Sequence, residues 1–205
     1  MLTIAKRVRL TPAGASLNGV RIRTGQTDTN GSLLTSIYRE QVGDYPKFFK
    51  MDPLCKLGFL ASEILLRDEP ERFVPRHDRA VVLFNRSGSF ASDSLYQHTI
   101  ADAANYYPSP AVFVYTLPNI VTGEIAIRNK YYGETSFYVL DGAPAGRIAA
   151  IVSDLFSDPE VRSALCGWVE YPDDAHFDAA LFLVERDGNS GMVWNEETIT
   201  LLMNE

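Results

Sequence analysis

The hydrophobic positions follow a two-residue period in some segments and a three-to-four-residue period in others, which predicts both strands and helices. Residues 2–10 and 16–23 show partial alternation, and the dipeptide Asn18-Gly19 predicts an N-terminal strand or hairpin. The apolar run at 80–84 is typical of a strand that is covered on both faces. Further strands are predicted at 163–169 and 179–185, and the segment 193–203 predicts a final strand or a terminal segment.

Helical spacing dominates several of the segments between these strands. Asp52 stands where an N-cap is expected and Pro53 in the first turn of a helix that ends near Arg67, before Pro70. Further helices are predicted at 33–42, 92–106, 120–127 and 148–155. Other segments predict irregular structure, namely 44–50, the turn-rich surface loop 25–32 and the charged loop 68–79.

The stretch 110–146 is the segment around which the rest of the chain is organised. It predicts a strand at 111–115, a turn at 117–119, the helix at 120–127 and a second strand at 135–140. A tight turn at 141–146 then leads into the helix at 148–155. Many α/β enzymes place a nucleophile in such a turn, but this one contains no Ser, Cys, Thr or Lys.

Alternating strands and helices predict an α/β fold with a mixed central sheet flanked by helices. The chain of 205 residues is long enough for one sizeable core. It shows no internal repeat and no low-complexity linker, so we expect a single domain over residues 1–205.

The composition of the chain argues against a nucleic-acid partner and against a membrane or secreted protein. A net charge of −7 argues against a nucleic-acid partner, which usually meets a basic surface. No apolar run approaches the length of about 20 residues that a membrane span needs, and the N-terminus lacks the apolar core of a secretory signal. Cys55 and Cys166 lie in apolar segments without metal-ligand spacing, which predicts buried, reduced thiols in a cytoplasmic protein. The sequence predicts neither a metal nor a cofactor.

Several polar residues are candidates for chemistry. The segment 85–89 follows a strand and resembles a phosphate-binding turn, but it lacks the Gly-x-x-x-x-Gly-Lys pattern, so a plain strand-to-helix turn is favoured. A nucleophilic Ser87 or Ser89 would need a base, and His98 is the nearest histidine in sequence. Solvated positions are expected for His77, His176 and the acidic turn Asp173-Asp174.

Asp141 is the acidic residue of most interest, because it ends the strand at 135–140 and begins the tight turn. One interpretation, which we favour, is an N-cap that accepts backbone N–H groups of the following helix. The other is a general base, which would give a remodelled pocket near Asp141 and Asn119.

The segment 117–152 resembles the N-terminal half of the β-ketoacyl synthases, the condensing enzymes of fatty-acid and polyketide synthesis, which have a thiolase-like fold. The residues that match the family pattern are Asn119, Gly123, Ile127, Gly133 and Gly146. Counting from Asn119 places the nucleophilic cysteine of the family at Gly142, whereas alignment on Gly146 places it at Ala143.

Two further segments are similar to the family in the correct order. Lys50-Met51-Asp52, with Leu57 and Ala61, resembles the start of one of its helices. Residues 161–170 resemble the strand that follows the nucleophile helix. The resemblance covers roughly residues 48–185, and the first 45 residues match only loosely.

The resemblance implies a truncated half that lacks the nucleophilic cysteine and the two histidines of the C-terminal half. Without a thiolate no acyl-enzyme can form at the tight turn, so catalytic residues are expected to be absent. The first hypothesis is therefore a pseudoenzyme: a chain-length-factor-like accessory subunit of a polyketide, aryl-polyene or fatty-acid-type pathway.

The resemblance also implies partners. The first is a full-length β-ketoacyl synthase that pairs through the strand at 135–140, and the second is acyl carrier protein. The alternatives are a homodimeric protein that binds an acyl chain or carrier protein, and an enzyme with a remodelled site near Asp141. Because a missing half would leave a sheet face and an edge open, an oligomer is expected.

Overall fold

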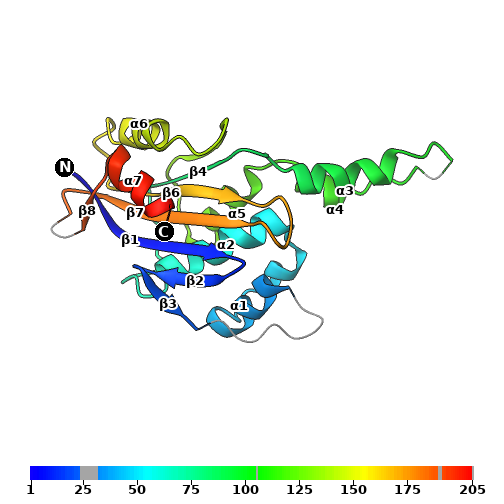
Figure 1. The fold of residues 1–205 in the computed structure, drawn as a ribbon, viewed down its shortest axis with the longest axis horizontal. Helices are drawn as coiled ribbons and strands as arrows, with labels where there is room; N and C mark the ends of the chain where they lie inside the picture. Colours follow the sequence, from blue (N-terminus) through cyan, green and yellow to red (C-terminus); the bar gives the residue numbers. More distant parts are fainter. Residues whose placement is uncertain (24–31, 105, 189–190, 205) are drawn as a thin grey trace.

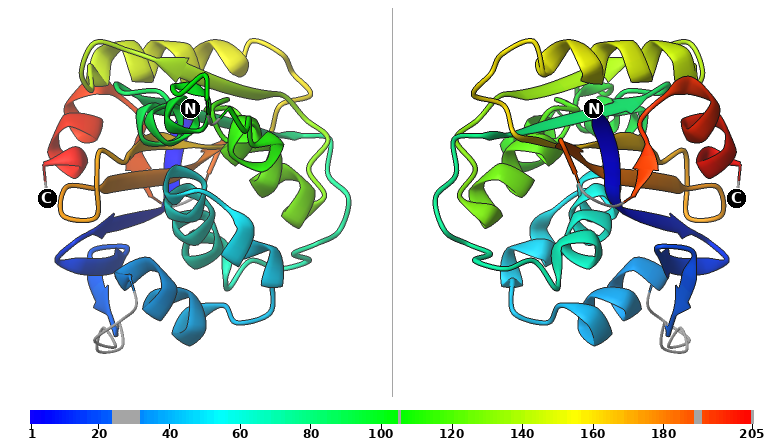
Figure 2. Two further views of the ribbon diagram at one scale, coloured as in Figure 1. Left: turned by 90° about the vertical axis from the view of Figure 1, so that its right-hand side faces the viewer. Right: turned by 90° about the vertical axis from the view of Figure 1, so that its left-hand side faces the viewer.

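The computed structural model describes residues 1–23, 32–104, 106–188 and 191–204. In this part of the chain an eight-stranded mixed sheet lies between two layers of helices (Figures 1 and 2), which confirms the predicted fold class. The strands are β1 (Leu2–Thr11), β2 (Gly14–Leu17), β3 (Val20–Ile22), β4 (Arg79–Asn85), β5 (Thr135–Val139), β6 (Ser163–Glu170), β7 (Asp178–Arg186) and β8 (Met192–Val193). The helices are α1 (Leu33–Gln41), the 3-10 helix η1 (Pro46–Lys50), α2 (Pro53–Leu66), α3 (Phe90–Ile100), α4 (Pro110–Val114), α5 (Ile120–Asn129), α6 (Ala145–Leu155) and α7 (Glu196–Met203).

The strand order is β3-β2-β1-β7-β6-β4-β5, and β8 pairs with β1. β4 is parallel to both of its neighbours, β5 and β6, whereas the other pairs are antiparallel. The connection from β4 to β5 passes through α5 on one face of the sheet, and the connection from β5 to β6 passes through α6 on the other. The first connection leads from β4 outward to β5, and the second leads from β5 back past β4 to β6. Because the two connections run in opposite directions and also cross opposite faces, they have the same handedness.

Alternation along β4 divides the core into two layers. Val81 and Leu83 point into the layer formed with α1, α2 and α5. Ala80, Val82 and Phe84 point into the layer formed with α6 and α7. The run predicted at 80–84 is therefore covered on both faces, and all seven residues of β4 are buried.

The second face of the sheet is not open, which corrects the expectation that a missing half would leave it uncovered. Ile148 and Val152 of α6 and Ile199 and Leu202 of α7 pack on it. The indole N–H of Trp194 donates to the Ala149 carbonyl at 3.2 Å and so joins the start of α7 to α6. The outward side of α6 is exposed and carries Arg147, Ala150, Ser153 and Asp154.

Most predictions of local structure are confirmed, and the turn and cap residues have the predicted roles. Asn18 and Gly19 join β2 to β3 with positive φ values of 52° and 78°, as a tight hairpin turn requires. Asp52 caps α2, Pro53 begins it, and Arg67 is the residue after its end. The helices predicted at 33–42, 120–127 and 148–155 correspond to α1, α5 and α6.

One of the secondary-structure predictions is wrong, and two are correct only in part. Residues 111–115 form α4 instead of a strand, because Ser109 caps its first turn and Pro110 has a backbone already suited to a helix start. The helix predicted at 92–106 is α3, which ends at Ile100. The segment predicted as a strand or terminal segment at 193–203 is mostly α7, whose N-cap Asn195 accepts a hydrogen bond from the Thr198 N–H.

Two further segments complete the comparison. The segment 44–50, predicted to be irregular, contains the 3-10 helix η1. All but the last residue of the predicted surface loop 25–32 lie outside the described residues. None of the described helices is long and apolar enough to cross a membrane.

Close packing of α2 on α5 depends on Gly58. A Cβ added there would lie 2.5 Å from Val121 Cγ2, so Gly58→Ala should lower the free energy of unfolding by about 1–3 kcal/mol through overpacking. Gly123 on α5 is the matched control, because an added Cβ meets nothing within 4 Å. Gly123→Ala should therefore raise stability by about 0.5–1 kcal/mol. Urea unfolding measures both, and equal effects of the two changes would contradict this account.

Candidate functional site

A hydrogen-bonded turn at the carboxyl end of β4 sets the direction of the chain that follows. The Asn85 side chain is fully buried, and its amide donates to the Gly88 carbonyl at 2.7 Å while its oxygen accepts the Gly88 N–H at 3.0 Å. Gly88 has a φ of 59°, a conformation that residues with a Cβ rarely adopt. The turn projects α3 and α4 away from the sheet (Figure 1).

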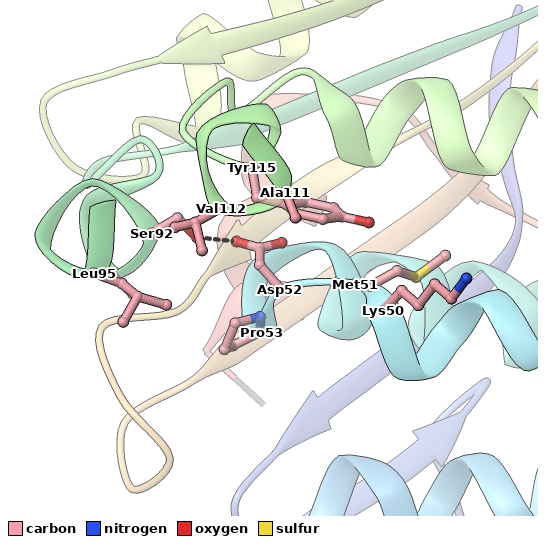
Figure 3. A pocket seen from close by; sticks show the side chains of 10 residues that line it. Lys50, Met51, Asp52, Pro53, Ser92, Leu95, Ala111, Val112 and Tyr115 are labelled. Atoms are coloured by element: carbon pink, nitrogen blue, oxygen red, sulfur yellow. Dashed lines mark hydrogen bonds between the residues drawn. The ribbon is translucent and has the colours of Figure 1, made fainter. Parts of the chain in front are cut away.

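A pocket of about 480 Å³ lies where α3 and α4 meet the start of α2 (Figure 3). Its walls are largely apolar. The lining residues are Lys50, Met51, Asp52, Pro53, Ala91, Ser92, Leu95, Ala111, Val112 and Tyr115. Because apolar clefts of a few hundred Å³ with few polar groups are the usual form of small-molecule sites, this pocket is the candidate functional site.

Asp52 is the acidic group of the pocket, and both of its oxygens are engaged. Oδ1 accepts the Cys55 N–H at 2.9 Å as the cap of α2, and Oδ2 accepts the Ser92 hydroxyl at 2.6 Å (Figure 3). Burial raises the pKa of Asp52, although the Ser92 hydroxyl, the Cys55 N–H and Lys56 act in the opposite direction. The bond to Ser92 ties α3 to α2 across the base of the pocket.

Tyr115, the residue after α4, places its ring beside the pocket (Figure 3). Burial, together with nearby Cys55, Glu124 and Asp52, raises the pKa of Tyr115 to about 12, so the phenol stays protonated at neutral pH. Glu124 is itself buried and forms an ion pair with Lys47 at 2.5 Å. Tyr115 is therefore neutral, and Asp52 and Glu124 each have an internal partner, which suits an apolar occupant better than a charged one.

The turn between β5 and α6 lies apart from this pocket. Gly142 has a φ of 80°, and the cap position of α6 is Pro144, which supplies no side-chain hydrogen bond. The favoured role of Asp141 as N-cap is therefore wrong. Its side chain is fully exposed, with an oxygen 4.0 Å from Arg86 Nε.

Neither residue of the remodelled pocket predicted near Asp141 and Asn119 lines the pocket of about 480 Å³. Asn119 is exposed at the start of α5, and its side chain makes no capping hydrogen bond. Ala143, one of the two positions that align with the family nucleophile, borders a different, more polar pocket of about 420 Å³ with Arg9, Asp178 and Glu196.

The serine and histidine candidates are not paired in the described residues. Ser87 donates to Glu170, and Ser89 donates to the Thr116 carbonyl at 2.5 Å. His98 Nδ1 lies 2.6 Å from the Ser94 carbonyl oxygen. A plain strand-to-helix turn therefore accounts for residues 85–89.

The predicted exposure of two histidines and the predicted burial of both cysteines are confirmed. His77 and His176 are exposed, and His176 lies 2.8 Å from Asp173 in the predicted acidic turn. Cys55 and Cys166 are buried free thiols, and burial raises the pKa of both, which disfavours the reactive thiolate. Within the described ranges no cluster of three potential metal ligands occurs.

Sequence reasoning identified Asp52 as a cap but missed the pocket around it. The walls come from segments about 40 and 60 residues apart in the chain, and their small apolar residues, such as Ala91 and Ala111, carry no chemical signature. One signal in the sequence could have indicated the pocket, namely that residues 87–123 contain no Lys, Arg or Glu. Helices that face only water normally carry these residues.

The cap predicts a pH-dependent test. Asp52→Ala should lower the free energy of unfolding by about 1 kcal/mol, the usual cost of losing an N-cap. Asp52→Asn keeps an acceptor without a buried charge, so it should match or exceed wild type at neutral pH. A raised pKa means that Asp52 stabilises the fold most when protonated. The free energy of unfolding of wild type, relative to that of Asp52→Asn, should therefore rise as the pH falls through the raised pKa of Asp52. Urea unfolding from neutral pH down through this pKa measures the difference. A wild type that instead loses stability relative to Asp52→Asn would refute the assignment.

The fold is that of the β-ketoacyl synthases. The structure of the ishigamide ketosynthase/chain length factor matches with a TM-score of 0.67 and 20% identity over 92% of this chain and 63% of that chain. A ketosynthase in complex with its chain length factor from Xenorhabdus doucetiae matches with a TM-score of 0.62 and 14% identity over 99% of this chain and 90% of that chain. A type II polyketide synthase acyl-carrier protein in complex with its ketosynthase matches with a TM-score of 0.60 and 11% identity over 91% of this chain and 63% of that chain.

These likenesses confirm the ketosynthase-like, thiolase-type fold that the motifs implied. The chain spans 63% of the length of the first and third of these structures. No protein-family model matches the sequence, and no curated protein is similar to it.

Proposed function

We propose that this chain is a non-catalytic, chain-length-factor-like subunit that pairs with an active β-ketoacyl synthase of a polyketide, aryl-polyene or fatty-acid-type pathway. The observation that carries the proposal is a ketosynthase fold whose β5–α6 turn has no nucleophilic side chain. The match over 90% of a chain from a ketosynthase–chain length factor complex supports it, since that chain is of similar length.

The turn is unsuited to forming an acyl-enzyme. Residues 141–146 read Asp-Gly-Ala-Pro-Ala-Gly, and neither Gly142 nor Ala143 can attack a thioester. The thiols of Cys55 and Cys166 are buried in α2 and β6, where a raised pKa keeps them protonated. A subunit with this turn contributes shape to a complex, and the partner contributes the chemistry.

The outer edge of β5 is the proposed pairing surface. β5 bonds to β4 on one side, and no described strand lies on its other side. An edge strand of this kind presents unpaired N–H and C=O groups that a strand of another chain can complete. Thr135 and Val139 are exposed on β5, and no charged residue interrupts the strand.

The pocket beneath α3 and α4 is the proposed place of a growing acyl chain. Its walls are apolar, and its acid Asp52 has both oxygens occupied by internal hydrogen bonds. In this role the pocket limits chain length by its volume, and acyl carrier protein delivers the chain to the partner synthase.

Two exposed valines on opposite edges of the sheet give a matched test of pairing. Val139 on β5 is 55% exposed and Val20 on β3 is 69% exposed. Val139→Lys should abolish co-purification with a tagged full-length β-ketoacyl synthase of the source organism, because a lysine charge would be buried in the joined sheet. Val20→Lys should leave it intact. A wild-type chain that binds no such synthase, or forms only a homodimer in light scattering, would overturn the proposal.

Filling the pocket tests its role in the complex. Ala111→Phe introduces a ring into the pocket wall, whereas Ala150→Phe places one on the exposed side of α6 as the control. The complex with Ala111→Phe should release products shorter by one condensation cycle or more, and Ala150→Phe should leave product length unchanged. Mass spectrometry of the products measures this. Unaltered lengths with Ala111→Phe in an intact complex would remove the pocket from chain-length control.

A further inference from the structure

The pocket of about 420 Å³ that Ala143 borders lies between the sheet, the start of α6 and α7, and we call it the Arg9 pocket. Arg9, Trp168 and Asp178 line it from the sheet, and Glu196 lines it from α7. It shares no lining residue with the pocket beneath α3 and α4. A cleft of this size with a few placed polar groups is the usual form of a small-molecule site.

Two neighbouring strands direct a charged side chain into the Arg9 pocket. Val8 and Leu10 belong to the core layer on the first face of the sheet, so Arg9 between them points to the second face. Ala180 of β7 belongs to the layer on the second face, and Asp178, two residues earlier, points the same way. The two charges therefore meet over one face, where β1 ends and β7 begins.

Arg9 and Asp178 form an ion pair that leaves one polar atom of each residue unused. Arg9 Nη2 donates to Asp178 Oδ2 at 2.9 Å, and Arg9 Nη1 donates to the Met203 carbonyl at 2.7 Å. Arg9 Nε and Asp178 Oδ1 are both buried, and neither has a hydrogen-bond partner among the described residues. Because a buried polar atom without a partner costs free energy, a molecule that bonds to both atoms gains affinity there.

The charges that line the pocket are balanced within the chain. Arg9 and Asp178 offset each other. The carboxylate of Glu196 lies against the start of α6, because a Cβ added at Gly146 would be 2.8 Å from Glu196 Cδ. Pro144, at the cap position of α6, supplies no side-chain hydrogen bond. The partial positive charge at the start of α6 therefore acts on the Glu196 carboxylate, and no charged ligand is needed to neutralise it.

The polar atoms of the pocket select against ionic ligands. Burial raises the pKa of Asp178, and Glu170 acts in the same direction while Arg9 acts in the opposite one. An anion would bring one more negative charge to these carboxylates. An ammonium ion donates to Asp178 but offers no acceptor to the Arg9 Nε–H. A carboxamide is neutral and serves both, because its oxygen accepts while its N–H donates.

We propose that the Arg9 pocket binds a small neutral molecule through a carboxamide, whose oxygen accepts the Arg9 Nε–H and whose N–H donates to Asp178 Oδ1. Trp168 forms one wall and is almost fully buried, so its indole ring packs against the apolar part of the ligand. This binding needs no synthase, so it is a property of the isolated chain whichever partner the chain has.

Three probes with the same ring and different polar groups test the choice of ligand: benzamide, benzoate and benzylammonium. Two-dimensional NMR of the purified, isotope-labelled chain measures binding, with the Trp168 indole N–H and the Gly146 amide as reporters. Benzamide should bind saturably with a Kd of about 1 mM or lower, and the two ions at least about 10-fold more weakly. An ion that binds as tightly as benzamide would overturn the carboxamide. Benzamide that fails to saturate either reporter would overturn the site.

Filling the pocket provides a matched pair of variants. Ala143 borders the pocket and Ala150 lies on the outward side of α6, and both are exposed, so phenylalanine at either position leaves the fold intact, as circular dichroism verifies. Ala143→Phe should raise the Kd for benzamide by about 10-fold or more, and Ala150→Phe should leave it unchanged. Equal Kd values for the two variants would place benzamide outside the Arg9 pocket.

Changes to the ion pair test the two hydrogen bonds. Arg9→Met with Asp178→Asn removes the Nε–H without leaving an unpaired buried carboxylate, and it should raise the Kd for benzamide by about 10-fold. Arg21→Met, at an exposed arginine of β3, is the control and should not. Asp178→Asn alone leaves the Arg9 charge unopposed, so it should shift the preference from benzamide toward benzoate. A loss of folding would not produce this shift, and an unchanged preference would overturn the role of Asp178.

Discussion

The structure depends on burying both faces of the central strands β4, β6 and β7. β4 is parallel to the neighbour on each side, β5 and β6, and is wholly buried. Each of its side chains therefore needs a helix to cover it on one face of the sheet or the other. α2 and α5 meet this need on one face, and α6 and α7 meet it on the other. Because α7 adds Ile199 and Leu202 to the second layer, and the residue before its N-cap adds Trp194, this sheet is covered by the chain itself.

Buried charges join the loops to this core. Arg79 at the start of β4 is almost fully buried and bonds to Glu69, Tyr131 and the Ser163 hydroxyl. Replacing one partner of such a buried ion pair leaves an unpaired charge, which is strongly destabilising. Within the charged loop 68–79, Glu69 is thus tied to β4, and Arg72 bonds to Glu63 of α2 and to Asn129 of α5, so these three side chains have structural partners.

With the two faces covered, the outer edge of β5 and the projecting helical pair α3–α4 remain outside the two core layers. This division explains why exposed apolar groups on α3, α4 and their connections are compatible with a well-packed protein. It also places the candidate pocket where this helical pair meets the body of the molecule.

Local signals in the sequence were sufficient for much of the fold. The cap and proline at Asp52-Pro53, the Asn18-Gly19 turn and the apolar run at 80–84 each depend on near neighbours, and each is where the pattern predicted it. The ketosynthase-like motifs likewise indicated the correct fold, and at least one of their glycines is required by a close approach of two backbone segments. At Gly133, for example, a Cβ would lie 2.3 Å from the Arg79 carbonyl oxygen.

The sequence by itself determined the α/β class, the order of most elements and the absence of Ser, Cys, Thr and Lys from the turn at 141–146. Only the tertiary structure decided that residues 111–115 belong to the helix α4 of a projecting helical pair, that Asp141 is no cap, and that α7 covers the second sheet face. The physical reason is that a run of β-branched and aromatic residues is compatible both with a buried strand and with an exposed helix. Which of the two forms depends on contacts with residues far away in the chain.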